Sequence, residues 1–163
     1  MDLGFIGVGN MGAGMANNLL KAGHSLTIHE LVRERATPLL ELGAKWADSP
    51  REVAEASEIT FTSLPAPVDM EAVSLGEAGI LEGSKPGTVY IDLSSNSVSL
   101  VRRMYGIFEA KGVHMLDAPV SGGEPKAIDG TLAIMVGGKQ AIFDKNLALM
   151  QVMGGNIVLT GDI

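Results

Sequence analysis

The chain of 163 residues has no cysteine, few aromatic residues and few basic ones. Without cysteine it can form neither a disulfide nor a thiolate zinc site. Its 12 lysines and arginines against 19 acidic residues give a formal net charge of −7. This balance excludes nucleic acid as the main partner, because phosphate backbones bind basic surfaces. It leaves open a small anionic ligand, which local backbone donors can hold even in an acidic protein.

Long apolar runs and leader-like segments are also missing. No run reaches the roughly 18 apolar residues of a membrane-spanning helix, so we expect no membrane partner. Met1-Asp2-Leu3 leads straight into a strand pattern, without the basic and apolar stretches of a secretory signal. We therefore expect a cytoplasmic protein. The length fits one domain with a normal core.

Glycine, by contrast, is abundant, and three of the 21 glycines stand near the start as Gly7, Gly9 and Gly12. The spacing G-x-G-x-x-G follows the apolar run 3–6 and opens a helical pattern over residues 11–22. In a dinucleotide site one glycine allows the turn, one lets the backbone approach a pyrophosphate and one lets the helix pack on the strand. The phosphates then lie at the helix N-terminus. The motif alone is weak evidence, and the flanking strand and helix strengthen it.

Strand and helix patterns alternate along the rest of the chain. Strand patterns cover residues 25–30, 45–47, 59–63, 88–93, 113–118, 131–136 and 156–159, and helical patterns cover 32–42, 97–111 and 140–153, with a further helix beginning at residue 50. This alternation predicts an α/β fold with a doubly wound, mostly parallel sheet of the Rossmann type over residues 1–163.

Glu30 ends the second strand, where a nucleotide-binding unit places the acid that binds the ribose hydroxyls. A 2′-phosphate beside this carboxylate would cost roughly 3 kcal/mol per unit charge at about 5 Å and an effective dielectric near 20. Glu30 therefore favours NAD over NADP. Two alternatives stay open: Glu30 is a solvated strand-end acid, or Arg33 and Arg35 turn towards a 2′-phosphate.

Three loops follow the fourth, fifth and sixth strands and should share one rim of the sheet. The first contains Leu64 and Pro65, the second covers residues 92–97 with several hydroxyl and amide groups, and the third contains the Ser-Gly-Gly turn 121–123. Successive backbone N–H groups of that turn could hold a substrate carboxylate, as an anion nest does.

No acid/base catalyst is evident in the chain. His24 and His114 fall at the beginnings of strands, and His29 lies near the adenosine end of the expected site. No metal-ligand spacing or Ser-His-Asp set is present. We expect Asp92 and Asp117 to be structural hydrogen-bonding residues rather than a paired acid and base.

These motifs together resemble those of the β-hydroxyacid dehydrogenases, a group that includes 3-hydroxyisobutyrate dehydrogenase and tartronate semialdehyde reductase and is related to 6-phosphogluconate dehydrogenase. The resemblance covers the whole chain and rests on residues 4–12, 15–24, 64–65, 92–95, 117–123 and 130–138. It implies hydride transfer between NAD, with NADP possible, and a small β-hydroxyacid or its semialdehyde.

The resemblance also implies the residues of the site. The cofactor residues are Gly7, Gly9, Asn10, Met11, Gly12, Glu30, Leu64, Pro65, Asp69 and Ser95, and the substrate residues are Ser121, Gly122 and Gly123. The family's catalytic lysine comes from an all-helical second domain beyond Ile163, so the resemblance implies a cofactor domain that is inactive alone. It further implies a homo-oligomeric full-length enzyme that acts on a small carboxylate.

Two departures from the family pattern are visible, and two other functions stay open. Lys126 stands where relatives usually have glycine, and residues 96–98 replace a more usual isoleucine and proline region. Gly130-Thr131-Leu132 favours the small-hydroxyacid branch over the phosphogluconate branch. The alternatives are a non-catalytic dinucleotide-binding module and an imine reductase on the same scaffold.

Overall fold

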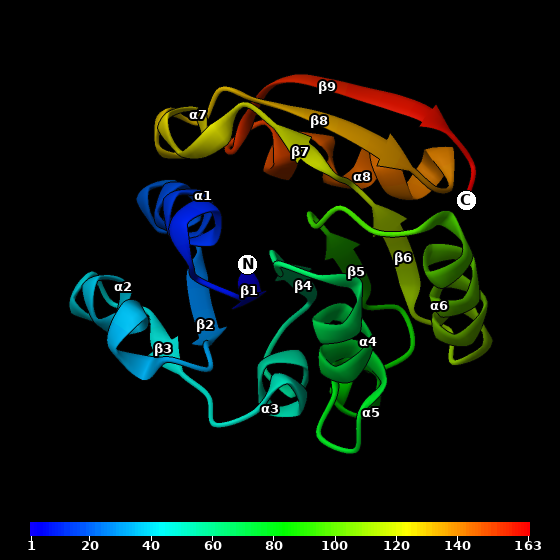
Figure 1. Cartoon of the computed structure of the whole chain (residues 1–163), viewed down its shortest axis with the longest axis horizontal. Helices are drawn as coiled ribbons and strands as arrows, with labels where there is room; N and C mark the ends of the chain where they lie inside the picture. The colour runs from blue at the N-terminus through cyan, green and yellow to red at the C-terminus, as the bar shows by residue number, and fades with distance from the viewer.

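The computed structural model describes residues 1–163 as a nine-stranded sheet between two layers of helices (Figure 1). The strands are β1 (Asp2–Ile6), β2 (Ser25–His29), β3 (Lys45–Trp46), β4 (Ile59–Thr62), β5 (Val89–Asp92), β6 (His114–Asp117), β7 (Val120–Ser121), β8 (Leu132–Gly137) and β9 (Gly154–Gly161). The helices are α1 (Asn10–Lys21), α2 (Thr37–Glu41), α3 (Pro50–Glu55), α4 (Pro67–Leu75), α5 (Ile80–Gly83), α6 (Val98–Ala110), α7 (Gly123–Asp129) and α8 (Gln140–Met150), with a 3₁₀ turn, η1 (Arg33–Ala36).

The order of the strands is β3-β2-β1-β4-β5-β6-β8-β7, and β9 pairs with β8. Strands β1 to β6 are parallel, whereas β8 runs antiparallel to β6 and β7. Figure 1 shows β7, β8 and β9 side by side at the top of the view, with α8 beneath them. The chain leaves β1 for β2 on one side and returns to β4 on the other. This reversal confirms the doubly wound fold and marks the crevice where such sheets bind ligands.

Apolar side chains cover both faces of the sheet and form two core clusters. The larger cluster has 26 buried residues and joins the sheet to α1, α2, α7 and α8. The smaller one has 13 and joins it to α3, α4, α5 and α6. Phe5 and Phe61 stack at 6.0 Å in the first, and the rings of Tyr90 and Phe108 lie 4.9 Å apart in the second. Burial on both faces explains why the central strands read as nearly continuous apolar runs.

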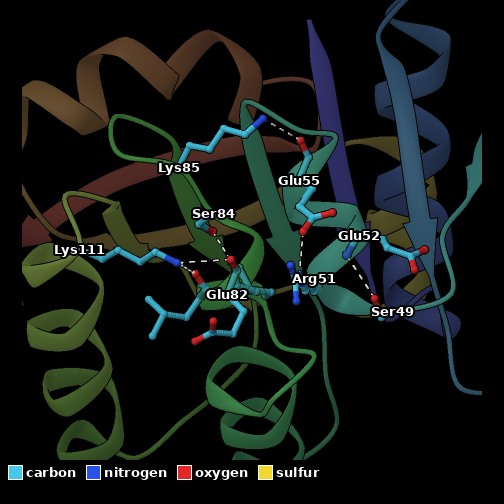
Figure 2. A network of polar contacts seen from close by, with 10 residues as sticks. Ser49, Arg51, Glu52, Glu55, Glu82, Ser84, Lys85 and Lys111 are labelled. Atoms are coloured by element: carbon cyan, nitrogen blue, oxygen red, sulfur yellow. Dashed lines mark hydrogen bonds and ion pairs between the residues drawn. The ribbon is translucent and has the colours of Figure 1, made fainter.

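Helices α3 and α5 are joined by polar contacts at the end of the sheet where the strands begin (Figure 2). Within α3, Arg51 donates to the Glu55 carboxylate at 2.7 Å, and Lys85, which follows α5, donates to the Glu55 carbonyl at 3.3 Å. A side chain at Gly83 would place its Cβ 2.1 Å from the carbonyl oxygen of Arg51, so the two helices touch through backbone. This network braces the sheet at the edge opposite the loops that follow β4 and β5.

Several elements differ from the sequence expectation. The helix expected over residues 32–42 is split into η1 and α2 near Pro38, which lacks the N–H that a continuous helix would need. Strand β7 and helix α7 were not expected, because the glycines and Pro125 around residues 121–125 indicate a turn. Strand β9 is longer than residues 156–159, since pairing with β8 accommodates its glycines. None of the helices combines the length and apolar character needed to cross a bilayer.

Candidate functional site

The three glycines after β1 have different surroundings. Gly7 has a φ of +87°, and a Cβ there would lie 2.3 Å from the carbonyl oxygen of Ser63. A Cβ on Gly12 would lie 1.9 Å from the carbonyl oxygen of Gly7. Both positions therefore need glycine for the turn and for the packing of α1 on β1. At Gly9, in contrast, a Cβ would meet no protein atom within 4 Å.

The open side of Gly9 lies at the N-terminus of α1. Gly9 is the N-cap residue with extended backbone angles, and no side chain caps the helix. The first N–H groups of an α-helix have no partner within the helix, so those beginning at Asn10 and Met11 are available to a ligand. The first turn of α1 carries no acidic residue. Unpartnered donors, the helix dipole and an uncovered glycine together fit a dinucleotide pyrophosphate.

Glu30 bends back over the glycine turn. Its Oε2 accepts a hydrogen bond from the backbone N–H of Val8 at 2.9 Å, and its Oε1 accepts one from Val32 at 3.3 Å. The Glu30 side chain is only 9% exposed. The alternative of a solvated strand-end acid is therefore wrong, and Glu30 lies beside the turn expected to hold the pyrophosphate.

The two arginines after Glu30 are placed differently from each other. The guanidinium of Arg33 lies over the ring of Trp46, 4.6 Å from its centroid. Arg35 approaches Glu30, with 4.0 Å between its nitrogen and Oε1, and its side chain is 60% exposed. Arg35 is thus the arginine that lies beside Glu30, whereas Arg33 lies against Trp46.

The loops after β4 and β5 meet at the same edge of the sheet, as expected. The N–H of Leu64 donates to the Ser94 hydroxyl at 2.9 Å and joins the two loops. Pro65 and Ser95 are exposed, and Asp69 lies partly exposed in the first turn of α4. Each of these three residues therefore has surface that is accessible from solvent.

A buried carboxylate underlies this junction. Asp92 ends β5 with no exposed surface, and its oxygens accept hydrogen bonds from Thr62, Ser94 and Asn96. Burial raises the pKa of Asp92 to about 6, although all three donors favour its charged form. Asp92 is therefore a structural hydrogen-bonding residue, as the sequence predicted.

Asp117 differs from that expectation. It is the register partner of Asp92 across β5 and β6, yet its Oδ1 is buried without a hydrogen-bond partner. Burial and the neighbouring charge of Asp92 raise the pKa of Asp117 to about 6. Thr62, Asp92 and Asp117 lie in one row across three strands. Each of the three is a polar residue that ends an apolar strand, but only the register of the strands brings them into one row.

The Ser-Gly-Gly turn joins β7 to α7: Ser121 ends β7 and Gly123 begins α7. Ser121 pairs with Ala133 of β8, and Gly122 and Gly123 have φ angles of +145° and +73°. All three residues of the turn are exposed. A Cβ on Gly122 would lie 2.7 Å from Cδ of Lys126, so the lysine stem fills the space beside that glycine. Lys126 therefore covers one side of the turn and leaves the Ser121 side open.

The three histidines lie at the strand ends that the sequence predicted. His24 precedes β2 and His114 begins β6, at the edge of the sheet away from the glycine turn. His29 ends β2, and its Nδ1 lies 3.0 Å from the carbonyl oxygen of Ala47, with the ring against Trp46.

Residues 2–161 match the protein family described as the NAD binding domain of 6-phosphogluconate dehydrogenase. The chain is 44% identical over 161 residues to 2-hydroxy-3-oxopropionate reductase of Escherichia coli K12, covering 99% of this chain and 55% of that protein. Its fold is similar to that of Mycobacterium tuberculosis 3-hydroxyisobutyrate dehydrogenase solved with L-serine. The TM-score is 0.91 at 33% identity, over 99% of this chain and 54% of that one.

An imine reductase variant from Myxococcus stipitatus in complex with NAD⁺ also has a similar fold. Its TM-score is 0.89 at 26% identity, and the match covers 99% of this chain and 55% of that chain. The chain spans about half the length of the first curated relatives it matches.

Proposed function

The chain belongs to the family of NAD-binding domains of the 6-phosphogluconate dehydrogenase type, and on this basis we propose that it is the cofactor domain of a hydroxyacid oxidoreductase. The enzyme transfers a hydride between NAD and a small β-hydroxyacid or its semialdehyde. The observation that carries the proposal is the open space beside Gly9, where a Cβ would meet no protein atom within 4 Å. At Gly7 and Gly12, by contrast, close backbone contacts leave no room for a side chain. The names of the reductase and dehydrogenase relatives support the substrate class.

In this proposal each part of the crevice holds one part of the cofactor. The pyrophosphate binds the N–H groups at the start of α1, from Gly9 to Met11. Glu30 accepts hydrogen bonds from the adenosine ribose, using lone pairs that Val8 and Val32 leave open. Leu64, Pro65, Asp69 and Ser95 surround the nicotinamide half. The bound nicotinamide supplies or accepts the hydride.

The Ser-Gly-Gly turn at residues 121–123 binds the carboxylate of the substrate through its hydroxyl and backbone N–H groups. The proton on the substrate oxygen is handled by a lysine of a second, all-helical domain, as the family resemblance implies. We therefore propose that the chain alone binds cofactor without turning over substrate. We also propose that the full-length enzyme is a homo-oligomer of the cytoplasm.

NAD is the preferred cofactor in this proposal. The Glu30 carboxylate is nearly buried against the glycine turn, so a 2′-phosphate at the ribose would meet a negative charge held in place. Arg33 is engaged with Trp46. Only Arg35 could approach a 2′-phosphate, and it would have to leave Glu30 to do so.

The test combines binding with turnover. Calorimetric titration of the chain should show NAD binding more tightly than NADP. The same sample, given NAD with 3-hydroxyisobutyrate or glycerate, should form no NADH. A folded sample that binds neither dinucleotide contradicts the cofactor role. NADH formation by the chain alone contradicts the requirement for the second-domain lysine.

A second candidate, imine reduction, is supported by the fold similarity to the imine reductase bound to NAD⁺. The identity of 26% to that structure is lower than the 44% to the hydroxyacid reductase. Assaying the full-length protein with a cyclic imine and with 2-hydroxy-3-oxopropionate separates the two. Faster reduction of the imine would favour the second candidate, and inactivity towards both would favour a non-catalytic binding module.

A further inference from the structure

Asp92 lies beneath the two loops assigned to the nicotinamide half of the cofactor. Its Oδ1 accepts hydrogen bonds from the Thr62 hydroxyl at 2.7 Å and from the N–H of Ser94 at 3.0 Å. Its Oδ2 accepts one from Nδ2 of Asn96 at 2.6 Å. One carboxylate therefore joins the end of β4 to two residues of the loop after β5.

The connection extends to the loop after β4. Ser94, which donates its N–H to Asp92, accepts the N–H of Leu64 at its hydroxyl. Ser95 is exposed and lies between Ser94 and Asn96, both of which Asp92 holds. The positions of Leu64 and Ser95, one from each loop, thus depend on the same buried group.

A carboxylate is suited to this task because it accepts hydrogen bonds on two oxygens and donates none when ionised. The three groups that point at it are all donors: a hydroxyl, a backbone N–H and an amide. Packing alone would not require this side chain, because a fully buried carboxylate is costly unless its hydrogen bonds are made. The hydrogen bonds to the loop after β5 offset this cost of burial. Asp92 therefore serves to hold the loop rather than to fill the core.

We propose that Asp92 is a positioning residue that fixes the Leu64 and Ser95 loops for the nicotinamide half of the cofactor. The inference rests on the proposed function. It predicts that Asp92 affects binding of the whole dinucleotide and not binding of its ADP-ribose part, because the glycine turn and Glu30 belong to other strands.

The experiment titrates wild type, Asp92→Asn, and Asp92→Asn with Asn96→Asp against NAD and against ADP-ribose. In Asp92→Asn a new NH₂ group takes the place of Oδ2 and faces the NH₂ group of Asn96. Because both groups are donors, the hydrogen bond between the two side chains is lost unless one amide turns. We expect NAD affinity to fall roughly tenfold, the effect of one hydrogen bond to a charged group, with ADP-ribose affinity unchanged. In the double variant an amide again faces a carboxylate, so NAD affinity should recover.

Ser74→Ala is the matched control. Ser74 is fully buried and belongs to the same polar chain, since its hydroxyl lies 3.0 Å from that of Tyr90, which lies 3.0 Å from that of Thr62. Its hydroxyl bonds to Met70 and Tyr90 and to neither loop, so its loss should lower thermal stability and leave both affinities unchanged. Should Asp92→Asn fail to fold, Asn96→Ala removes the same bond from the surface side and should give the same selective loss.

Three outcomes distinguish a failure of the positioning role of Asp92 from a failure of the proposed function. Equal losses of NAD and ADP-ribose affinity, or no recovery in the double variant, would overturn the positioning role and leave the proposed function intact. A loss of NAD affinity in Ser74→Ala that matches the loss in Asp92→Asn would reduce Asp92 to a structural role. If wild type binds neither ligand, the proposed function fails and this inference fails with it.

Discussion

At the scale of single residues, Glu30 has a structural role in addition to the ligand-binding role that we propose for it. Its carboxylate accepts the N–H of Val8 in the glycine turn, so it holds that turn against the end of β2. The same group forms the negative wall of the proposed ribose site. Cofactor preference and local stability are therefore coupled at this position.

Glu30→Ala should lose the preference for NAD over NADP. The substitution removes the like charge and releases Arg35, whose guanidinium lies 4.0 Å from Glu30, towards a 2′-phosphate. We expect the ratio of the two dissociation constants to change roughly tenfold or more, as one lost charge repulsion of 1.4 kcal/mol or greater implies. Glu34→Ala removes a neighbouring exposed acid and is the control. An unchanged ratio in Glu30→Ala would show that Glu30 does not read the ribose.

Asp117 makes stability depend on pH. The pKa of its carboxyl is raised in the folded protein to about 6 from an ordinary value of 3.8, by burial and by the charge of Asp92. The folded state therefore binds more protons than the unfolded chain between these values, and stability falls as pH rises from about 4 through 6.

Asp117→Asn removes this titration. Relative to wild type, the variant should gain roughly 1 kcal/mol in the free energy of unfolding between pH 4 and pH 8, an estimate reduced for the partial exposure of Asp117. Urea unfolding of both proteins at several pH values measures the difference. If the variant's gain in free energy of unfolding over wild type stayed constant or fell as pH rises, the raised pKa of Asp117 would be contradicted.

At the scale of elements, helix α7 depends on its contact with α1. A Cβ on Gly14 of α1 would lie 2.9 Å from the backbone nitrogen of Ile128, so the two helices meet backbone to backbone. Nδ2 of Asn18 donates to the carbonyl oxygen of Ala127 at 2.9 Å across the same contact. This packing places the start of α7, and with it the Ser-Gly-Gly turn, on the side of the sheet that carries α1.

Gly14→Ala should destabilise the protein by roughly 1–3 kcal/mol, because neither backbone can move away cheaply. Gly106→Ala is the matched control: Gly106 lies in α6, is exposed, and has no atom within 4 Å of a built Cβ. There alanine should stabilise the helix by roughly 0.5–1 kcal/mol. Thermal or urea unfolding compares the two, and a neutral Gly14→Ala would mean that the helices separate easily.

The same contact explains which elements the sequence could and could not reveal. Helix α1 was predictable because its glycines, its apolar face and the strand before it all lie within 20 residues. Helix α7 was not, because two glycines and Pro125 oppose a helix locally and the partner that stabilises it is distant in sequence. The hydrogen bond from Val8 to Glu30 was hidden for the same reason, although the place of Glu30 at the end of β2 was predictable.

At the scale of the whole molecule, the order of the strands decides where a ligand can bind. The reversal between β1 and β4 places the switch point of the sheet beside the glycine turn, and the parallel strands β4 and β5 bring their loops to the same edge. The alternation of strands and helices predicted this arrangement. The row of Thr62, Asp92 and Asp117 could not be predicted, since it depends on the register of three strands.

Calorimetric titration of wild type and Gly9→Ala with NAD shows whether a dinucleotide binds across the N-terminus of α1. A Cβ at Gly9 meets no protein atom within 4 Å and its φ of −68° suits alanine, so the variant should fold with unchanged stability. Its methyl group would occupy the proposed pyrophosphate site. We expect NAD to bind wild type and to bind the folded variant at least roughly tenfold more weakly. Equal affinities in the two proteins would contradict this expectation.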